Sequence, residues 1–145
     1  MDKAVLVFWS GTGNTEAMAE SIAKGAGEAG AELQVLQVSD TDAKQVSVYG
    51  NILLGCPAMG AEVLEESEFE PFFTELEPML AGKRVALFGS FGWGDGEWMR
   101  LWEERVTNAG AALFENGLMI NEAPDNQGLA SCEAFGMRFI KEGHT

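Results

Sequence analysis

Hydrophobic residues gather into five short, nearly continuous runs along the chain. Apolar runs of this kind are typical of strands that are buried on both faces of a parallel sheet. The strands predicted from them are Lys3 to Trp9, Leu33 to Val38, Asn51 to Cys56, Arg84 to Ser90 and Ala112 to Asn121.

Between most of these runs, apolar residues recur at the three- and four-residue spacing of one helix face. The first helical segment ends at Gly30, the second follows Ser67 and Glu70 at capping-box spacing, and a short irregular or helical connection precedes Asn51. Strands that alternate with helices predict an α/β fold, in which a doubly wound five-stranded parallel sheet lies between helices on both faces. The apolar positions of the four helices are Thr15, Met18, Ala19, Ile22, Ala23 and Ala26; Phe69, Phe72, Phe73 and Leu76; Trp98, Leu101, Trp102 and Val106; and Leu129, Cys132, Phe135, Phe139 and Ile140.

Length and charge narrow the classes of function. The 145 residues suit a single domain that spans residues 1–145. With 23 acidic and 9 basic side chains, the net charge is 9 − 23 = −14, which repels nucleic acids and anionic lipids. A basic protein surface is therefore the expected partner. No apolar run is long enough for a signal peptide or a membrane span, so we expect a cytoplasmic protein.

Cysteine and histidine are too scarce for several kinds of site. Cys56 and Cys132 make neither a disulfide framework nor a zinc site, and we expect both thiols to be buried and free. His144 is the single histidine and stands next to the end of the chain. Histidine-dependent nucleophiles and histidine-ligated metals are therefore excluded.

Three loops that follow predicted strands carry the candidate chemistry, because ligands of such sheets bind at the carboxyl ends of the strands. The first loop consists of Ser10, Gly11, Thr12, Gly13, Asn14 and Thr15. Its glycines let backbone N–H groups approach an anion, and the following helix adds its positive dipole. A neutral phosphate-binding loop and an ordinary strand-to-helix turn both fit these residues.

The second loop runs from Cys56 to Glu62, and its candidate residues are Pro57, Ala58, Met59, Gly60, Ala61 and Glu62. It lacks the lysine of a nucleotide-triphosphate loop. Met59 suits either core packing or the cover of a flat ligand, and Glu62 suits either a solvated charge or an acceptor for a ring N–H. Gly60 permits the positive φ of a tight turn.

The third loop contains Ser90, Phe91, Gly92, Trp93 and Gly94. Glycine neighbours provide no side chains to cover an indole, so Trp93 either stacks on a ligand or lies under a neighbouring loop.

Together, three motifs resemble those of the short-chain flavodoxins of anaerobic bacteria such as clostridia. They are Ser10-Gly11-Thr12-Gly13-Asn14-Thr15-Glu16, Ala58-Met59-Gly60 and Gly89-Ser90-Phe91-Gly92-Trp93-Gly94, and the resemblance extends to Asn121-Glu122-Ala123-Pro124-Asp125. It implies the strand order 2-1-3-4-5, with non-covalently bound FMN as the cofactor. It also implies that the first loop binds the FMN phosphate, that Met59 and Trp93 enclose the ring and that Glu62 accepts from flavin N3–H. The Gly60 carbonyl would turn toward flavin N5 on reduction. Ala61 and Phe91 replace a polar residue and a tyrosine that are frequent in relatives.

The implied function is low-potential, one-electron transfer, in which FMN shuttles between semiquinone and hydroquinone. The implied partners are redox proteins with basic docking surfaces, such as ferredoxin- or flavodoxin-type reductases and oxidoreductases, and the implied state is a monomer. Seven glutamates and no basic residue occur from Glu62 to Glu77, which suggests electrostatic steering of such partners. A flavin-dependent quinone reductase on the same fold is the alternative. A phosphatase or phosphate receiver is disfavoured, since no acidic pair ends the first strand and no arginine follows Cys56 at the spacing required.

Overall fold

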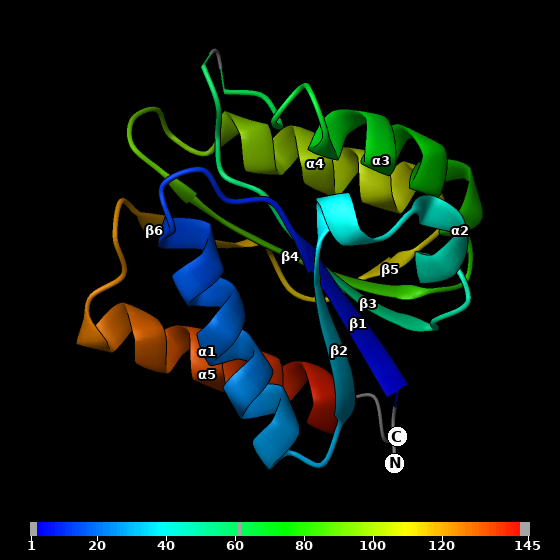
Figure 1. Ribbon diagram of the computed structural model, residues 1–145, viewed down its shortest axis with the longest axis horizontal. Helices are drawn as coiled ribbons and strands as arrows, with labels where there is room; N and C mark the ends of the chain where they lie inside the picture. Colours follow the sequence, from blue (N-terminus) through cyan, green and yellow to red (C-terminus); the bar gives the residue numbers. More distant parts are fainter. Residues whose placement is uncertain (1–2, 61, 143–145) are drawn as a thin grey trace.

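The computed structural model describes residues 3–60 and 62–142, which form a parallel sheet between two layers of helices (Figure 1). The sheet has the order β2-β1-β3-β4-β5, and β6 pairs with the end of β4. This confirms the expected α/β class and strand order. The strands are β1 (Lys3–Phe8), β2 (Glu32–Gln37), β3 (Asn51–Gly55), β4 (Arg84–Phe91), β5 (Ala112–Leu113) and β6 (Leu118–Asn121).

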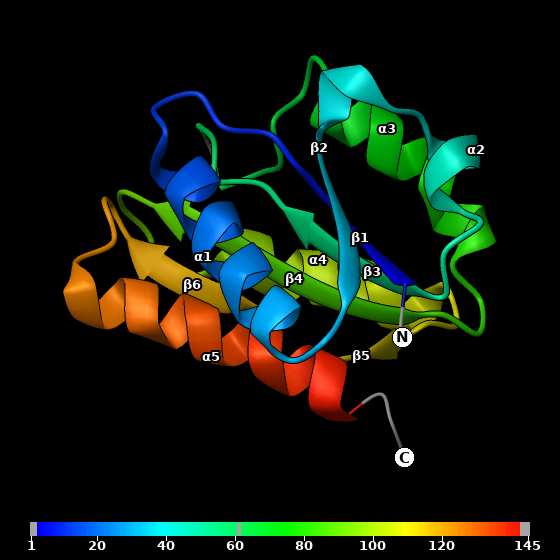
Figure 2. The same cartoon turned by 60° about the horizontal axis from the view of Figure 1, so that its bottom comes forward.

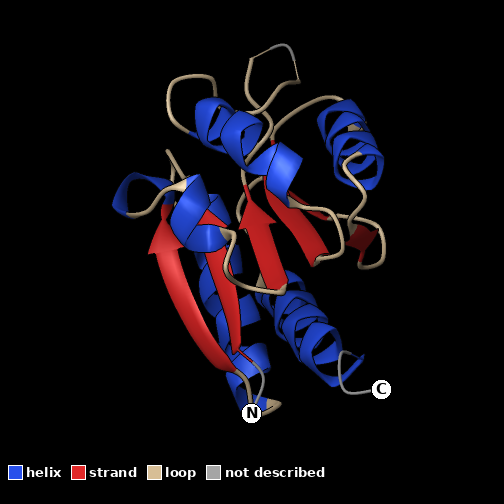
Figure 3. Cartoon of the chain, turned by 90° about the vertical axis from the view of Figure 1, so that its right-hand side faces the viewer, coloured by secondary structure: helices blue, strands red, loops and turns tan. Residues whose placement is uncertain are grey.

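Helices cover both faces of the sheet (Figures 2 and 3). One face carries α1 (Asn14–Glu28) and α5 (Asn126–Glu142). The other carries α3 (Phe69–Leu76) and α4 (Glu97–Asn108), with the short α2 (Ala43–Val46) beside α3. Two 3₁₀ turns, Val38–Asp40 and Glu77–Met79, complete the connections.

Side chains of each central strand alternate between two hydrophobic cores. In β1, Val5 and Val7 join the core under α3 and α4, whereas Leu6 and Phe8 join the core under α1 and α5. Every residue of β1 after Lys3 is buried, because the strand is covered on both faces. This explains why the strands are recognisable as continuous apolar runs.

The expected fifth strand is wrong as one continuous element. The segment from Ala112 to Asn121 is divided into β5 and β6. Between them Glu115 adopts a positive φ of 53°, and its carboxylate pairs with Arg138 of α5. The N–H of Gly117 donates to Glu103 of α4 at 2.6 Å. These polar contacts hold the chain away from the edge of β4, which pairs with β5 and β6 separately.

The expected capping box of α3 is also wrong. Neither Ser67 nor Glu70 caps the helix. The buried carboxylate of Glu65 instead accepts from the N–H groups of Ser67, Glu68 and Phe69 and from the Ser67 hydroxyl. An acceptor of formal negative charge at a helix N-terminus satisfies several free donors and complements the helix dipole.

Both cysteines are free and buried, as predicted. Burial raises the pKa of the Cys132 thiol to about 12 and that of Cys56 further, so both remain protonated at neutral pH. Within residues 3–60 and 62–142, no helix combines the length and apolar composition needed to cross a membrane. His144 and Ala61 lie outside the described residues.

Candidate functional site

The three candidate loops meet at the carboxyl edge of the sheet, at the upper left of Figure 1. There β1 and β3 are neighbours, but the chain leaves β1 toward α1 on one face and β3 toward α3 on the other. A crevice forms where the chain departs in opposite directions, which is the usual ligand site of this class of sheet.

Hydrogen bonds that converge on Ser90 hold the loops together. The Ser90 hydroxyl and the Thr15 hydroxyl share a hydrogen bond of 3.0 Å, and the Ser90 N–H donates to Thr15 Oγ1 at 3.3 Å. The N–H of Ala58 donates to the Ser90 carbonyl at 3.0 Å. Thr15 and Ser90 are buried, so this pair connects the first, second and third loops out of contact with water.

A cavity of about 240 Å³ lies between the loops. Nine of the predicted site residues line it. The other described site residues do not line the cavity; they are Ser10, Gly13, Thr15, Gly60, Glu62, Trp93 and Gly94. The nine are Gly11, Thr12, Asn14, Pro57, Ala58, Met59, Ser90, Phe91 and Gly92.

The first loop presents unpaired donors at the start of α1. Gly13, with a φ of 96°, is the N-cap and supplies no side-chain acceptor. The Ser10 hydroxyl accepts from the N–H groups of Gly13 and Glu16. Among the described residues, nothing accepts from the N–H groups of Asn14 and Thr15. Two free donors at the positive end of a helix are suited to an anion.

The second loop is a tight hairpin that is closed by Met59 and Val63. Each residue donates its N–H to the carbonyl of the other, at 2.8 and 3.0 Å. Gly60 has a φ of 46° and Glu62 a φ of 56°. The left-handed conformation costs a non-glycine residue roughly 1–2 kcal/mol. Glu62 is therefore held in a strained backbone, as is frequent in ligand-binding loops.

The Glu62 side chain is buried, with 7% of the residue exposed, and its Oε1 has no hydrogen-bond partner among the described residues. A Cβ atom at Gly94 would overlap with this carboxylate, so the third loop admits Glu62 only because Gly94 has no side chain. A buried carboxylate oxygen without a donor is unfavourable, and a ligand N–H would satisfy it.

Trp93 does not line the cavity, and 65% of the residue is exposed. Its neighbours Gly92 and Gly94 leave the indole uncovered, so it does not lie under a neighbouring loop. An exposed indole beside the crevice is able to cover a flat ligand.

Sequence reasoning missed two lining residues, Trp9 and Glu122. Trp9 was assigned to the first strand, but it follows β1, and its Nε1 donates to Glu68 Oε1 at 3.0 Å. Its ring lies 2.9 Å from the position that a Cβ of Gly11 would occupy, so a side chain there would require the indole to shift. Glu122 follows β6 with a φ of 57°, and its N–H donates to the Phe91 carbonyl at 2.7 Å. The Asn121-to-Asp125 motif was the available signal for Glu122, whereas an apolar strand gave none for Trp9.

Comparison with known proteins identifies close relatives. The flavodoxin family model matches residues 6–136. The chain is 50% identical to a flavodoxin of Clostridium beijerinckii over 133 residues, which cover 92% of this chain and 96% of that protein. It is 52% identical to a flavodoxin of Megasphaera elsdenii over 121 residues, which cover 83% and 88%. The solution structure of two-electron reduced Megasphaera elsdenii flavodoxin matches with a TM-score of 0.87 and 48% identity, covering 95% of this chain and 98% of that one.

Proposed function

Since this chain belongs to the flavodoxin family, whose members are FMN-binding electron carriers rather than enzymes, we propose that it transfers electrons one at a time and at low potential. FMN supplies the redox chemistry when it is bound, and the protein sets its environment. Residues 1–145 would act as one FMN-binding domain and as a monomer.

The observation that carries the proposal is the buried, unpartnered Oε1 of Glu62, which lies against Gly94 of the third loop. Flavin N3–H is a donor that would satisfy this oxygen. The first loop offers the N–H groups of Asn14 and Thr15 at the positive end of α1, which suit the phosphate. The residues of this chain therefore fit FMN at both of its polar ends.

Between the two ends, other residues of the loops would hold the ring. Met59 lines the cavity, and the exposed Trp93 is free to cover the other side of a flat ring. The remaining contacts would come from the backbone of Pro57, Ala58, Phe91 and Gly92. This assignment is supported by the lining residues of the cavity and by the exposure of Trp93.

We propose that the Gly60 carbonyl accepts a hydrogen bond from flavin N5–H once the flavin is reduced. It has a φ of 46°, is exposed, and has no atom within 4 Å of a Cβ position, so its peptide has room to rotate. A hydrogen bond that forms only after reduction favours the reduced cofactor by about 1 kcal/mol.

Low potential is attributed to the negative charge of the protein. A carboxylate about 10 Å from the flavin, at an effective dielectric constant of about 40, disfavours one added negative charge on the flavin by about 0.8 kcal/mol. Glu62 and Glu122 adjoin the loops that would hold the cofactor, and the whole chain carries −14. Several such carboxylates outweigh the single hydrogen bond at Gly60.

Stepwise reduction of the FMN-loaded protein, followed by visible absorption, tests the proposal. We expect two separate one-electron steps, with the second at a much lower potential than the first. Riboflavin, which lacks the phosphate, is the matched control and should bind more weakly. A single two-electron step would contradict the proposal and would favour a quinone reductase.

The partners are redox proteins, and we propose that they dock through basic surfaces. The acidic segment from Glu62 to Glu77 begins in the second loop and continues through α3, so it borders the cofactor site. Its charge would draw a basic protein toward this edge of the molecule.

A further inference from the structure

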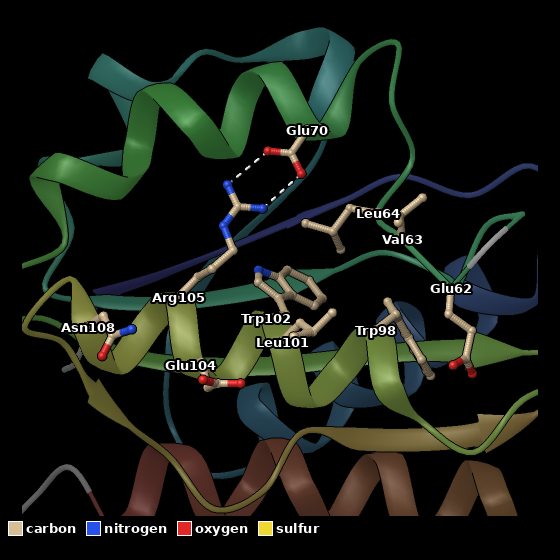
Figure 4. A pocket seen from close by; sticks show the side chains of 10 residues that line it. All are labelled: Glu62, Val63, Leu64, Glu70, Trp98, Leu101, Trp102, Glu104, Arg105 and Asn108. Atoms are coloured by element: carbon tan, nitrogen blue, oxygen red, sulfur yellow. Dashed lines mark hydrogen bonds and ion pairs between the residues drawn. The ribbon is translucent and has the colours of Figure 1, made fainter.

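A second cavity, of about 410 Å³, lies beside the cofactor loops, between residues 62–64, α3 and α4 (Figure 4). Glu62 stands at one end of this cleft and Asn108 at the other. Trp98 and Trp102 of α4 line it from within, and Val63 and Leu101 belong to its edges. The cleft therefore starts at the loop that is proposed to hold the flavin ring.

The cleft exposes large apolar side chains. Leu101 is 49% exposed and Val63 is 38% exposed, although helical spacing predicts Leu101 on the buried face of α4. Met99 is buried in its place. The helix is turned so that Leu101 faces the cleft, where described residues leave half of it uncovered. Exposed apolar side chains within a polar rim are typical of an interaction surface.

The rim of the cleft is acidic. Three carboxylates line it: Glu104 is exposed, Glu70 is paired with Arg105, and Glu62 is buried. Arg105 is the one basic lining residue, and its guanidinium is already bound by Glu70 at 2.8 Å and by Glu77 at 3.1 Å. Its positive charge is thus compensated within the protein. A partner with basic side chains complements this rim.

One buried hydrogen-bond donor in the lining of the cleft has no acceptor among the described residues. This donor is Trp102 Nε1, although the indole is buried and packs edge-on against Phe69 and Phe73. The neighbouring Trp98, by contrast, donates to the Cys56 carbonyl at 3.2 Å. An unsatisfied buried donor is rare in folded proteins and indicates a missing acceptor.

We propose that this cleft is the docking site of a basic redox protein, which inserts an apolar side chain between Val63 and Leu101. Lysine or arginine side chains of the partner would face Glu104. Docking here places the partner beside the cofactor loops, where electrons leave. The inference rests on the proposed electron-carrier function and adds the contact that holds the partner in place.

The test compares two aspartate substitutions in the FMN-loaded, fully reduced protein. Leu101→Asp removes the apolar contact from the cleft. Val48→Asp adds the same charge at an 80% exposed residue that does not line the cleft. The readout is the second-order rate of reduction of mitochondrial ferricytochrome c, a basic haem protein, at low and at high salt.

The two substitutions separate apolar docking from simple attraction. Extra negative charge alone would leave the rate unchanged or raise it. We expect Leu101→Asp to lower the rate by about fivefold at both salt concentrations, as loss of an apolar anchor does, and Val48→Asp to leave it within twofold. Leu101→Ala, which changes no charge, should lower the rate in the same direction.

Equal rates for Leu101→Asp and the parent protein would overturn the docking site while leaving the carrier function intact. Failure of the parent protein to bind FMN or to reduce the acceptor would instead overturn the proposed function. If the parent protein forms a dimer that Leu101→Asp dissociates in sedimentation experiments, a second copy occupies the cleft, and the assignment to a redox partner is wrong.

Discussion

Ser90 links the first loop, which is proposed to bind the phosphate, to the second loop, which is proposed to hold the ring. Its hydroxyl fixes Thr15 in the first turn of α1, and its carbonyl receives the N–H of Ala58. Ser90→Ala keeps the second contact and the hydrogen bond from the residue 90 N–H to Thr15 Oγ1, but removes the bond between the two hydroxyl groups. We expect FMN affinity to fall by up to about tenfold, since loss of one buried hydrogen bond costs about 1 kcal/mol. Riboflavin affinity should change little, because riboflavin has no phosphate for α1 to hold.

Fluorescence titration of the apoprotein with each flavin measures this difference. Ser47→Ala is the matched control, because the Ser47 hydroxyl is exposed and donates only to the carbonyl of Lys44. An equal loss of FMN and riboflavin affinity would show that Ser90 does not act through the phosphate end.

Single residues also mark where sequence reasoning succeeded and where it could not. Gly11 and Gly94 were recognised as loop glycines, but the contacts at them are set by the folded backbone: the Trp9 ring turns back over Gly11 within its own loop, and the Glu62 carboxylate reaches Gly94 from another loop. Leu101 shows the same limit, because helical spacing places it on the apolar stripe while the cleft beside α4 leaves it exposed. The local sequence pattern predicts which type of residue stands at a position, whereas contacts made in the folded protein determine the role of that residue.

Helices α1 and α5 approach each other closely because two glycines face the crossing. A Cβ at Gly25 would overlap with the Glu133 carbonyl, and a Cβ at Gly136 would overlap with the Ile22 carbonyl. Alanine is favoured over glycine within a helix by about 1 kcal/mol. At Gly25 the clash is with backbone, which cannot move aside without separating the helices, and overpacking of this kind costs about 1–3 kcal/mol or more.

Gly25→Ala should therefore lower the free energy of unfolding by about 1–2 kcal/mol after the helix-propensity gain is included. Gly27→Ala lies on the same helix with no atom within 4 Å of its Cβ position and should instead raise it, by up to about 1 kcal/mol. Urea denaturation of both variants measures the two changes in the free energy of unfolding. Stabilisation by both substitutions would show that the helices separate without penalty.

Helix α3 depends on a carboxylate that precedes it. Burial acts to raise the pKa of Glu65, but the hydrogen bonds from Ser67, Phe69 and Glu68 outweigh it and lower the pKa below its ordinary value of 4.5. A group whose folded-state pKa is lowered stabilises the fold above its unfolded-state pKa, and this stability is lost as the pH falls through the folded-state value.

Glu65→Gln should lower the stability at pH 7 by about 1 kcal/mol, the usual contribution of a helix cap. The amide NH₂ group of the new side chain would face backbone N–H donors and cannot accept hydrogen bonds from them. The difference from the parent protein should shrink as the pH falls below about 4.5, where the carboxylate of the unfolded parent chain begins to be protonated, and should vanish below the lower pKa of the folded state. Urea denaturation at a series of pH values measures it, and a difference that stays constant with pH would contradict the assigned role.

The elements themselves were largely predictable, since burial on both faces gives the central strands their continuous apolar sequences. The cap of α3 and the break between β5 and β6 were not. Glu65 lies outside the usual capping spacing, and the break depends on Arg138 and Glu103, which reach residues 115 and 117 from two helices. Contacts of this kind become visible only when the layers are assembled.

The whole molecule carries a net charge of −14, concentrated in part in the run from Glu62 to Glu77. Like charges repel one another, and this repulsion is greater in the compact folded state than in the extended unfolded chain. The described ion pairs compensate a minority of the carboxylates, because the chain contains 9 basic and 23 acidic residues. The repulsion is weakened by salt, whose screening length falls from about 30 Å at 0.01 M to about 10 Å at 0.1 M.

Added NaCl should therefore raise the thermal midpoint of the apoprotein between about 0.01 M and 0.15 M, by several degrees if repulsion costs about 1 kcal/mol. Glu66→Lys is the matched variant, because Glu66 is exposed within the acidic run and has no ion pair among the described residues. It should raise the midpoint at low salt and lose this advantage at high salt. Scanning calorimetry measures both. A midpoint that is insensitive to NaCl would show that the acidic run does not repel itself appreciably in the folded protein. Its charge would then act on approaching partners at no cost in stability.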